Sequence, residues 1–180
     1  MHPVEQKFKK SINEILSFEK RILVAVSGGP DSVVLLHLLN KHKLEASKIT
    51  IAIAHLNHLS RGTDSYKDSD FVARLGRSLN IQTFIENIDI GSLSDKRKTS
   101  FQESARIIRH NFLKRSLKKW CGDLIALGHN SDDQAETFLI NLLRGSGLRG
   151  LTGTRPKRDA FIRPLLYLNL WAVVFLIYPL

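Results

Sequence analysis

The chain of 180 residues is long enough for one domain with a sizeable hydrophobic core, and its 43% hydrophobic and 24% charged residues are ordinary for a globular protein. It contains 27 Lys and Arg against 17 acidic residues, and this charge of +10 favours a polyanionic partner, nucleic acid before an anionic membrane surface. The single cysteine, Cys121, excludes a disulfide framework and any metal or redox site built on two cysteines of this chain. We therefore expect a reduced, cytoplasmic compartment.

Apolar periodicity divides the sequence into alternating helices and strands. In chain order we expect a helix at 4–19, a strand at 21–26, a helix at 31–41, a strand at 49–55 and a helix capped by Asp64 that ends near Leu79. A strand at 82–87, a polar loop at 89–99, a helix capped by Ser100 that runs to about Trp120, a strand at 123–128 and a helix at 132–143 follow. Short apolar strands between helices predict an α/β, Rossmann-like parallel sheet with helices on both faces.

The first predicted strand ends abruptly at the stretch SGGPDS, Ser27 to Ser32. Ligands of open parallel sheets bind beyond the carboxyl ends of the strands, and Gly28 and Gly29 let the main chain approach a ligand closely. The unpaired N–H groups at the start of the next helix, together with its dipole and the hydroxyls of Ser27 and Ser32, make an anion site. Asp31 fits such a site if Mg²⁺ bridges its carboxylate to phosphate oxygens. The alternative is a tight strand–helix turn in which Asp31 is an ordinary helix-start acid.

Three other functional glycine turns do not fit this stretch. The phosphate loop G-x-x-x-x-G-K-[ST] requires a lysine that is missing here, and the dinucleotide fingerprint G-x-G-x-x-G is absent. A nucleophile elbow requires G-x-S-x-G, but Ala25 stands two residues before Ser27.

Several motifs, in order along residues 20–166, resemble one family. The stretch SGGPDS resembles the pyrophosphatase loop, SGGxDS, of enzymes that adenylate a substrate and release pyrophosphate, the PP-loop or N-type ATP pyrophosphatases. Four further segments resemble the corresponding segments of tRNA(Ile)-lysidine synthetases: HLNHLSRG (55–62), QESARIIRHNFL (102–113), GHNSDDQAETFLINLLRGSGLRGLTG (128–153) and IRPLL (162–166).

The resemblance implies an ATP-dependent ligase. Such an enzyme activates C2 of the wobble cytidine in CAU-anticodon tRNA(Ile) with ATP. The ε-amine of L-lysine then displaces AMP, which gives lysidine, AMP and diphosphate and changes decoding from AUG to AUA. The resemblance implies ATP and Mg²⁺, with Asp31 as the Mg²⁺ ligand and the catalytic residue. It assigns to ATP binding Ser27, Gly28, Gly29, Pro30, Asp31, Ser32, His55 and Asn57.

Two acidic residues are candidates for binding lysine. Asp133 and Glu136 lie three apart in a predicted helix, hence on one face, where two carboxylates can hold the ammonium groups of lysine. The resemblance assigns both positions to lysine, whereas the alternative is that they complement the helix dipole. Arg106 and Arg109 also share a helix face, and they either bind a phosphate or the lysine carboxylate bidentately or form a solvated basic face.

Three histidines, His55, His58 and His129, lie at predicted strand ends. A zinc site built on them lacks a fourth ligand of ordinary spacing. The resemblance instead places His55 and Asn57 in the adenosine pocket.

Basic residues gather in two regions. Residues 96–119 carry nine Lys or Arg and one acid. The second region is a glycine-rich loop and its flank, where a flexible backbone can follow RNA phosphates. We expect tRNA binding there, at Arg144, Arg149 and Arg155, and the alternative for both regions is a solubilising surface.

We expect residues 1–166 to form the N-terminal catalytic domain and 167–180 to be a divergent apolar tail, in a truncated chain without the C-terminal tRNA-binding domains of the family. The uncharged stretch 165–180 is shorter than the about 20 residues that a membrane span needs, so we expect no membrane anchor. The expected partners are tRNA(Ile) and L-lysine, with a homodimer as the one protein assembly considered. Two alternatives stay open: an inactive nucleotide- or RNA-binding remnant, and a related enzyme that thiolates tRNA.

Overall fold

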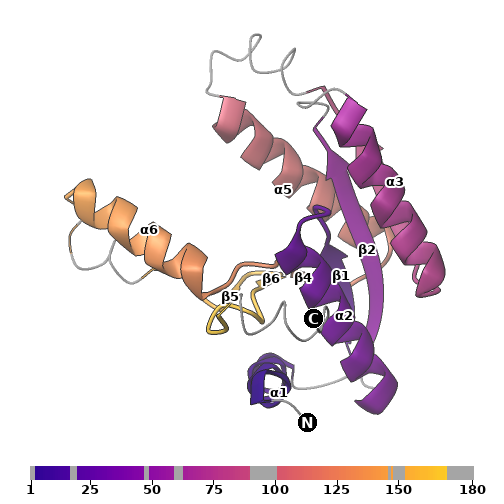
Figure 1. Cartoon of the computed structure of the whole chain (residues 1–180), viewed down its shortest axis with the longest axis horizontal. Helices are drawn as coiled ribbons and strands as arrows, with labels where there is room; N and C mark the ends of the chain where they lie inside the picture. The colour runs from indigo at the N-terminus through magenta and orange to yellow at the C-terminus, as the bar shows by residue number, and fades with distance from the viewer. Residues whose placement is uncertain are drawn as a thin grey trace.

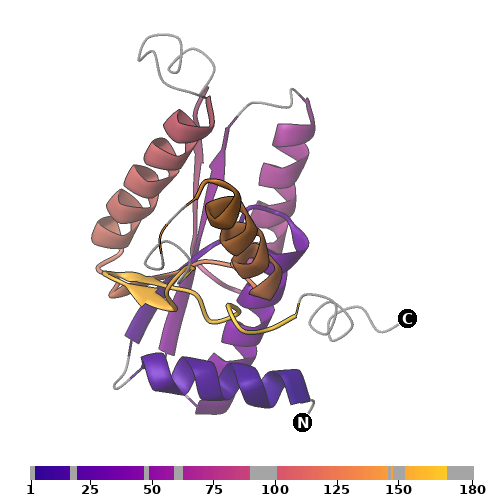
Figure 2. The ribbon, with the colours of Figure 1, turned by 90° about the vertical axis from the view of Figure 1, so that its left-hand side faces the viewer.

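The computed structural model describes residues 3–16, 20–46, 49–58, 63–89, 101–145, 147 and 153–169. Six strands form one sheet in the order β3-β2-β1-β4-β6-β5, with helices on both of its faces (Figures 1 and 2). Every neighbouring pair of strands is parallel except β5 and β6. The predicted α/β fold with a parallel sheet is therefore confirmed.

All nine predicted helices and strands are present, in the predicted order. The sequence patterns do not predict the hairpin β5–β6, because strands of two residues are too short to show alternation. The elements are α1 (Pro3–Ile15), β1 (Lys20–Ala25), α2 (Pro30–Ala46), β2 (Ile49–Asn57), α3 (Thr63–Ser78), β3 (Thr83–Asn87), α5 (Phe101–Lys119), β4 (Leu124–Ala126), α6 (Ser131–Leu143), β5 (Lys157–Arg158) and β6 (Phe161–Ile162).

Several predicted boundaries are wrong, and the end of α2 is the error with a visible cause. Helix α3 begins at Thr63, so Asp64 lies inside its first turn and is not the cap. Helix α2 continues past the predicted end at Lys41, because Lys41 and Glu45 form ion pairs with α1, to Glu5 and Lys9. The predicted cap at Ser100 and residues 90–99 of the predicted loop lie outside the described residues.

Side chains of the central strands alternate between two helical layers. One core cluster joins Ile22 and Ile53 to the helices α1, α2 and α3. The other joins Ala25 and Ala54 to α5, which contributes Phe112. Figure 2 shows α5 on one side of the sheet and α2 and α3 on the other. Both faces of β1 and β2 are thus covered, as their near-continuous apolar sequences require.

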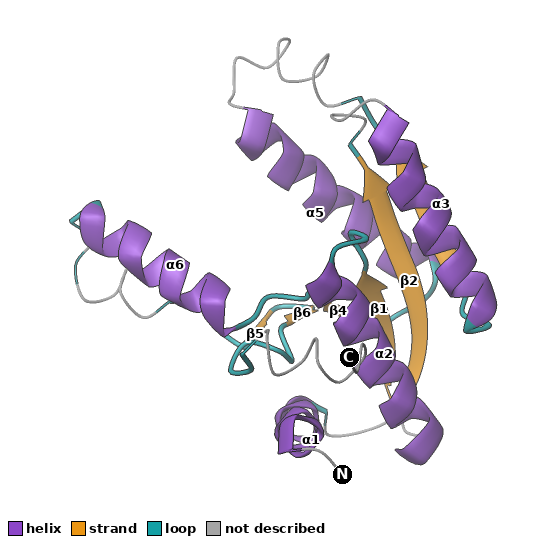
Figure 3. Ribbon diagram, viewed as in Figure 1, coloured by secondary structure: helices purple, strands orange, loops and turns teal. Residues whose placement is uncertain are grey.

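Helix α6 projects away from the sheet (Figure 3). None of its residues is buried, and its apolar side chains are largely exposed, Leu143 at 87%. The chain then returns to the body, where Leu165 and Leu168 are buried in the first core cluster. The predicted boundary at residue 166 therefore falls within a packed segment, and the rest of the tail, 170–180, lies outside the described residues. Among the helices that the structure describes, none combines the length and the apolar character that crossing a membrane requires.

Candidate active site

The sheet has a topological switch point between β1 and β4. From β1 the chain moves outward to β2 and then β3, and it later returns to place β4 on the other side of β1. Ligands of open parallel sheets bind at such a point, beyond the carboxyl ends of the strands. The SGGPDS turn follows β1 directly, and the segment from Gly128 to Asn130 follows β4, so the fold brings SGGPDS and the start of the motif at 128–153 together.

The SGGPDS turn is held by its own side chains. The hydroxyl of Ser32 donates to the carbonyl of Gly29 at 2.8 Å and accepts from the N–H of Ser27 at 3.1 Å. Gly28 has φ of +95°, a conformation that other residues rarely adopt. A Cβ at Gly28 would meet only Asp68, at 3.5 Å, so the backbone conformation and not a lack of space requires glycine here.

Helix α2 starts immediately after this turn, with Pro30 as its first residue. N–H groups in the first turn of a helix have no acceptor within the helix, so this end of α2 offers donors to an anion. The loop after β4 lies directly against it, because a Cβ on Gly128 would stand 3.1 Å from the backbone nitrogen of Ser32. A glycine at 128 therefore allows the β4–α6 loop to reach the SGGPDS turn.

A first cavity of about 460 Å³ opens between the SGGPDS turn, the end of β2 and helix α5. Its floor includes Ala25 and Ala54, whose small side chains leave space between the sheet and Phe112 of α5. His55 and Asn57, the predicted adenosine residues, both line this cavity together with Ser27, Gly28 and Gly29. Apolar walls with a few polar groups are typical of nucleotide sites.

The hydrogen bonding of His55 fixes which of its ring nitrogens can accept. Its Nδ1 lies 2.8 Å from the carbonyl of Val26, so Nδ1 carries the proton and donates. Nε2 is then a buried acceptor with no partner in the part of the chain that the structure describes. Burial lowers the pKa of His55, against smaller opposing effects of Val26 and Asp68, so the ring is neutral at pH 7.

Acidic side chains meet where α2 and α6 begin. Asn130 caps α6 by accepting from the N–H groups of Asp132 and Asp133, at 2.8 and 3.2 Å, and its side chain also hydrogen-bonds to Asp31. Burial raises the pKa of Asp31, and the charges of Asp133 and Asp132 raise it further, while the Asn130 hydrogen bond opposes them. A cation bound among these carboxylates would relieve that repulsion.

A second cavity, of about 620 Å³, lies between α5, the ends of β4 and β6, and the β5–β6 hairpin. Its lining includes the predicted pair Arg106 and Arg109, with His129 and Arg163. Arg163 Nε donates to His129 Nδ1 at 3.1 Å, and burial, followed by the charge of Arg163, lowers the pKa of His129. Arg109 also lines the first cavity, so its guanidinium stands between the two.

The sequence profile of the PP-loop domain matches residues 1–173. The chain belongs to this family. The tRNA(Ile)-lysidine synthase of Clostridium perfringens is 41% identical over 158 residues, which is 87% of this chain and 34% of that protein. The tRNA(Ile)-lysidine synthase of Chlorobaculum tepidum is 38% identical over 168 residues, 92% of this chain and 50% of that protein. The chain thus spans about a third to a half of the length of these curated relatives.

Among solved structures, the U34-tRNA thiolase NcsA from Methanococcus maripaludis, which holds a [4Fe-4S] cluster, superposes with a TM-score of 0.78. The match covers 96% of this chain and 61% of the thiolase at 21% sequence identity, which supports the PP-loop fold alone.

The PP-loop contains one position suited to Mg²⁺. Oδ1 of Asp31 is buried and has no hydrogen-bond partner within the described residues. In those residues no three His, Cys, Asp or Glu side chains group to hold a metal ion. A single carboxylate suits Mg²⁺, which keeps waters and takes its other ligands from phosphates. The lack of such a group among the described residues gives no support to a zinc site on the three histidines. His129 lies in the second cavity, whereas His55 and His58 line the first.

The remaining predicted residues lie on the periphery of the PP-loop site. Asp133 lies beside Asp31, whereas Glu136, one turn further along α6, is exposed. Arg144 and Arg155 are both exposed, at the end of α6 and before β5. Arg149 lies outside the described residues.

Sequence reasoning missed three residues of the site. Asp68 lines the first cavity, but in the sequence it is one of several acids on a polar helix. Phe112 forms a wall of that cavity and looks like an ordinary core residue. Asn130 joins α6 to Asp31, and its position just before SDD marks it as a helix cap.

Proposed function

We propose that this chain carries the catalytic part of a tRNA(Ile)-lysidine synthase. The reaction is the ATP-dependent ligation of L-lysine to C2 of the wobble cytidine in CAU-anticodon tRNA(Ile), through an adenylated cytidine. The similarity to two lysidine synthases supports this. The observation that carries it is the hydrogen bond between Asp31 of the PP-loop and Asn130, the cap of α6, because it brings the ATP site next to the start of the helix that carries the candidate lysine-binding residues Asp133 and Glu136.

ATP binds with its adenine in the first cavity and its β- and γ-phosphates on the PP-loop. The N–H groups at the start of α2 donate to the phosphates, and Asp31 would hold Mg²⁺, which would neutralise their charge. Oxygen O2 of the cytidine attacks the α-phosphorus, and diphosphate leaves as the bond to the β-phosphate oxygen breaks. The PP-loop stabilises this leaving group, since its donors are already oriented by the Ser27–Ser32 hydrogen bonds.

Lysine binds between α6 and the second cavity. Asp133 and Glu136 receive its ammonium groups by charge-assisted hydrogen bonds. Arg109, with Arg106 at the rim, receives its carboxylate. The charges of Asp133 and Arg109 shift the pKa of His129 in opposite directions, so both lie near this ring. The ε-ammonium first loses a proton to solvent, and the free amine attacks C2. The bond from C2 to the oxygen of the adenylate breaks, AMP leaves, and the new C–N group loses its remaining extra proton to solvent.

The tRNA contacts proposed from the sequence are Arg144, Arg149 and Arg155. Arg144 and Arg155 are exposed at the two ends of the glycine-rich segment that follows α6. The alternative reaction is thiolation, and this chain offers no cysteine near the PP-loop for it. The single cysteine, Cys121, lies before β4, at the amino end of the strands, opposite the edge that carries the site.

Lysine incorporation is the direct test. The purified chain, with ATP, Mg²⁺ and labelled lysine, should modify a CAU-anticodon tRNA(Ile) transcript and release one diphosphate per lysine incorporated. A transcript with uridine at the wobble position should stay unmodified. Binding of ATP and tRNA without incorporation would instead identify a remnant without activity.

Asp31→Asn should reduce incorporation by about 10²–10³-fold, because the phosphates lose the carboxylate that holds Mg²⁺. The matched control is Asp70→Asn, which removes an exposed acid of α3 away from the site. Since neighbouring acids and burial raise the pKa of Asp31, its charge is unfavourable in the folded protein at neutral pH, and Asp31→Asn should melt at the same or a slightly higher temperature. Full activity of Asp31→Asn would overturn the proposed mechanism.

A further inference from the structure

Helices on the two sides of the sheet differ in charge. Helix α5 carries six Lys or Arg and one acid, Glu103, over nineteen residues. Helix α3, on the other side, carries three Lys or Arg and three acids over sixteen residues. The excess of positive charge in the described residues is therefore concentrated on the side of α5.

Part of this charge on α5 is neutralised and part is not. Arg106 pairs with Glu103, and Arg115 pairs with Glu86 of β3 at 2.9 Å. Three exposed lysines further along the helix have no ion-pair partner in the described part of the chain: Lys114, Lys118 and Lys119. Because Lys114 and Lys118 are four residues apart, they extend from one side of the helix, about 6 Å apart along its axis.

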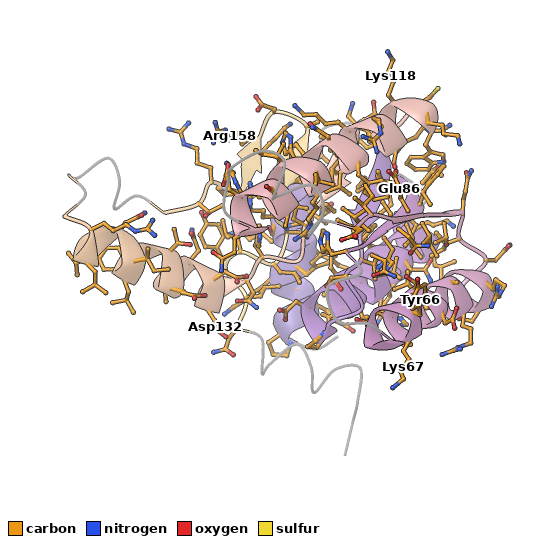
Figure 4. All side chains as sticks on the ribbon, turned by 90° about the horizontal axis from the view of Figure 1, so that it is seen from above. Tyr66, Lys67, Glu86, Lys118, Asp132 and Arg158 are labelled. Carbon is orange, nitrogen blue, oxygen red and sulfur yellow. The ribbon has the colours of Figure 1, made fainter. Side chains whose placement is uncertain are left out.

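The basic surface continues from α5 onto the β5–β6 hairpin. Burial lowers the pKa of His110, and the charges of Lys114 and Arg106 on α5 and of Arg158 on β5 lower it further, against Asp159, so cations from two elements surround this ring. Figure 4 shows Lys118 and Arg158 on the same side of the molecule, the side of α5, with Asp132 and Lys67 on the opposite side.

An aromatic platform and a cavity lie at the end of this surface. The ring of His110 stacks on Phe161 with centroids 4.5 Å apart and 17° between the planes. Phe161 is buried beneath it, whereas His110 is exposed. His110 and Arg158 both line the second cavity, which also reaches Arg109 beside the nucleotide pocket. The lysines of α5, the exposed His110 ring and the second cavity therefore form one continuous surface that ends next to the proposed ATP site.

We propose that the outer face of α5, formed by His110, Lys114 and Lys118 with Arg158 of β5, binds the phosphate backbone of the substrate RNA and guides the strand into the second cavity. The choice of RNA rests on the function proposed above. Lysines bind phosphates without regard to sequence, and an exposed imidazole offers a face on which a base stacks. An anionic membrane fits less well, because Ile108, Phe112 and Leu113 of α5 are buried, and the exposed Ile107 does not make an apolar face that could enter a bilayer.

A matched pair of double variants tests this surface. Lys114→Gln/Lys118→Gln and the control Lys7→Gln/Lys10→Gln remove the same charge, but the control lysines are exposed on α1, in the other helical layer. Dissociation constants for a CAU-anticodon tRNA(Ile) transcript are measured with the full chain over a range of salt concentrations. The α5 variant should weaken binding and reduce the slope of log K against log salt by about 2, and the control should leave the slope unchanged. Equal slopes in the two variants would overturn the proposal.

Lysine acetylation with and without the transcript gives a second readout on the unmodified protein. Bound RNA should protect Lys114 and Lys118, while Lys7 and Lys10 stay reactive. If lysine is incorporated into the transcript but α5 is not protected, the proposed RNA surface is refuted and the proposed reaction stands. If α5 is protected but no lysine is incorporated, the RNA surface is supported and the proposed reaction is refuted. Binding of anionic vesicles but not of RNA would overturn the surface as an RNA site.

Discussion

The two faces of the sheet come from the same strands but have different compositions. Toward α1, α2 and α3 the strands present large side chains such as Ile22 and Ile53, both fully buried. Toward α5 they present Ala25 and Ala54, and both cavities described above touch α5. Large branched side chains fill one face, so that face stabilises the fold, whereas the small side chains of the other face leave room for ligands.

The helical layers follow the same division. The ion pairs Lys9–Glu45 and Lys41–Glu5 join α1 to α2, so the charged side chains of these helices are used to hold the two helices together. On the other side, Arg109 faces both cavities, and no hydrogen bond or ion pair to a described residue satisfies it. Burial lowers the pKa of Arg109, which shows that its charge is held at a cost that an anion would offset.

Two neighbouring residues of β2 provide the sharpest test of this difference. Ile53→Ala removes a buried side chain from the α2 face and should destabilise the fold by about 3 kcal/mol. Ala54→Leu adds a side chain on the opposite face, where it extends into the first cavity, and should weaken ATP binding about 100-fold. Because Ala54 lines the cavity but is itself buried in the second core cluster, Ala54→Leu displaces some neighbours and should cost about 1–2 kcal/mol of stability, less than Ile53→Ala.

Chemical denaturation and ATP titration of both variants check this pair. Folded Ile53→Ala protein should keep its ATP affinity within about 2-fold, since Ile53 does not line the cavity. The comparison fails if Ala54→Leu binds ATP normally, or if the two variants lose stability equally.

Features of the two faces that depend on residues close together in the sequence were predictable from the sequence. Strands and helices were predicted from local periodicity and are confirmed, and the anion site was predicted from Gly28 and Gly29 next to a strand, which again needs only local sequence. The division of Ile53 and Ala54 between a filled and an open face also follows from alternation, once α5 is known to cover one side.

Features that depend on contacts between distant segments were not accessible. The second cavity forms only when the β5–β6 hairpin pairs beside β4, and two-residue strands give no pattern in the sequence. Asp68 lines the first cavity and Arg158 lines the second, in both cases because segments distant in the sequence pack together. The sequence did predict Asp133 as a ligand of lysine, but not its proximity to Asp31, which needs Gly128 to let two loops approach.

Glu136→Gln separates the two substrates within the site. Glu136 is exposed on α6, one turn from Asp133, and it lines neither of the two cavities described. Loss of its charge should raise the KM for lysine about 10-fold, because a charge-assisted hydrogen bond becomes a neutral one. The KM for ATP should stay within about 2-fold. Steady-state kinetics with each substrate varied in turn measure both, and equal increases would contradict a lysine pocket on α6.

His55→Ala should have the smallest effect, and it tests how the α5 face recognises the base. Neutral His55 offers Nε2 as an acceptor, which suits the amino group of adenine and not the carbonyl oxygen of guanine. Its loss should weaken ATP binding about 5- to 10-fold and reduce the preference for ATP over GTP. His55→Gln, which keeps an acceptor oxygen, should recover part of the preference.

The pH dependence of that preference follows from the protonation of His55. Since burial lowers the pKa of His55, the neutral ring predominates at neutral and higher pH, and the ATP preference of the wild type should be greatest there. At lower pH, protonation turns Nε2 into a donor, which opposes the adenine amino group, so the preference should decline. Equilibrium binding of both nucleotides from acidic to neutral pH measures it. If His55→Ala keeps the preference for ATP over GTP at every pH, the adenine is recognised by another residue of the first cavity. The α5 face would then provide space for the base without a hydrogen bond from His55.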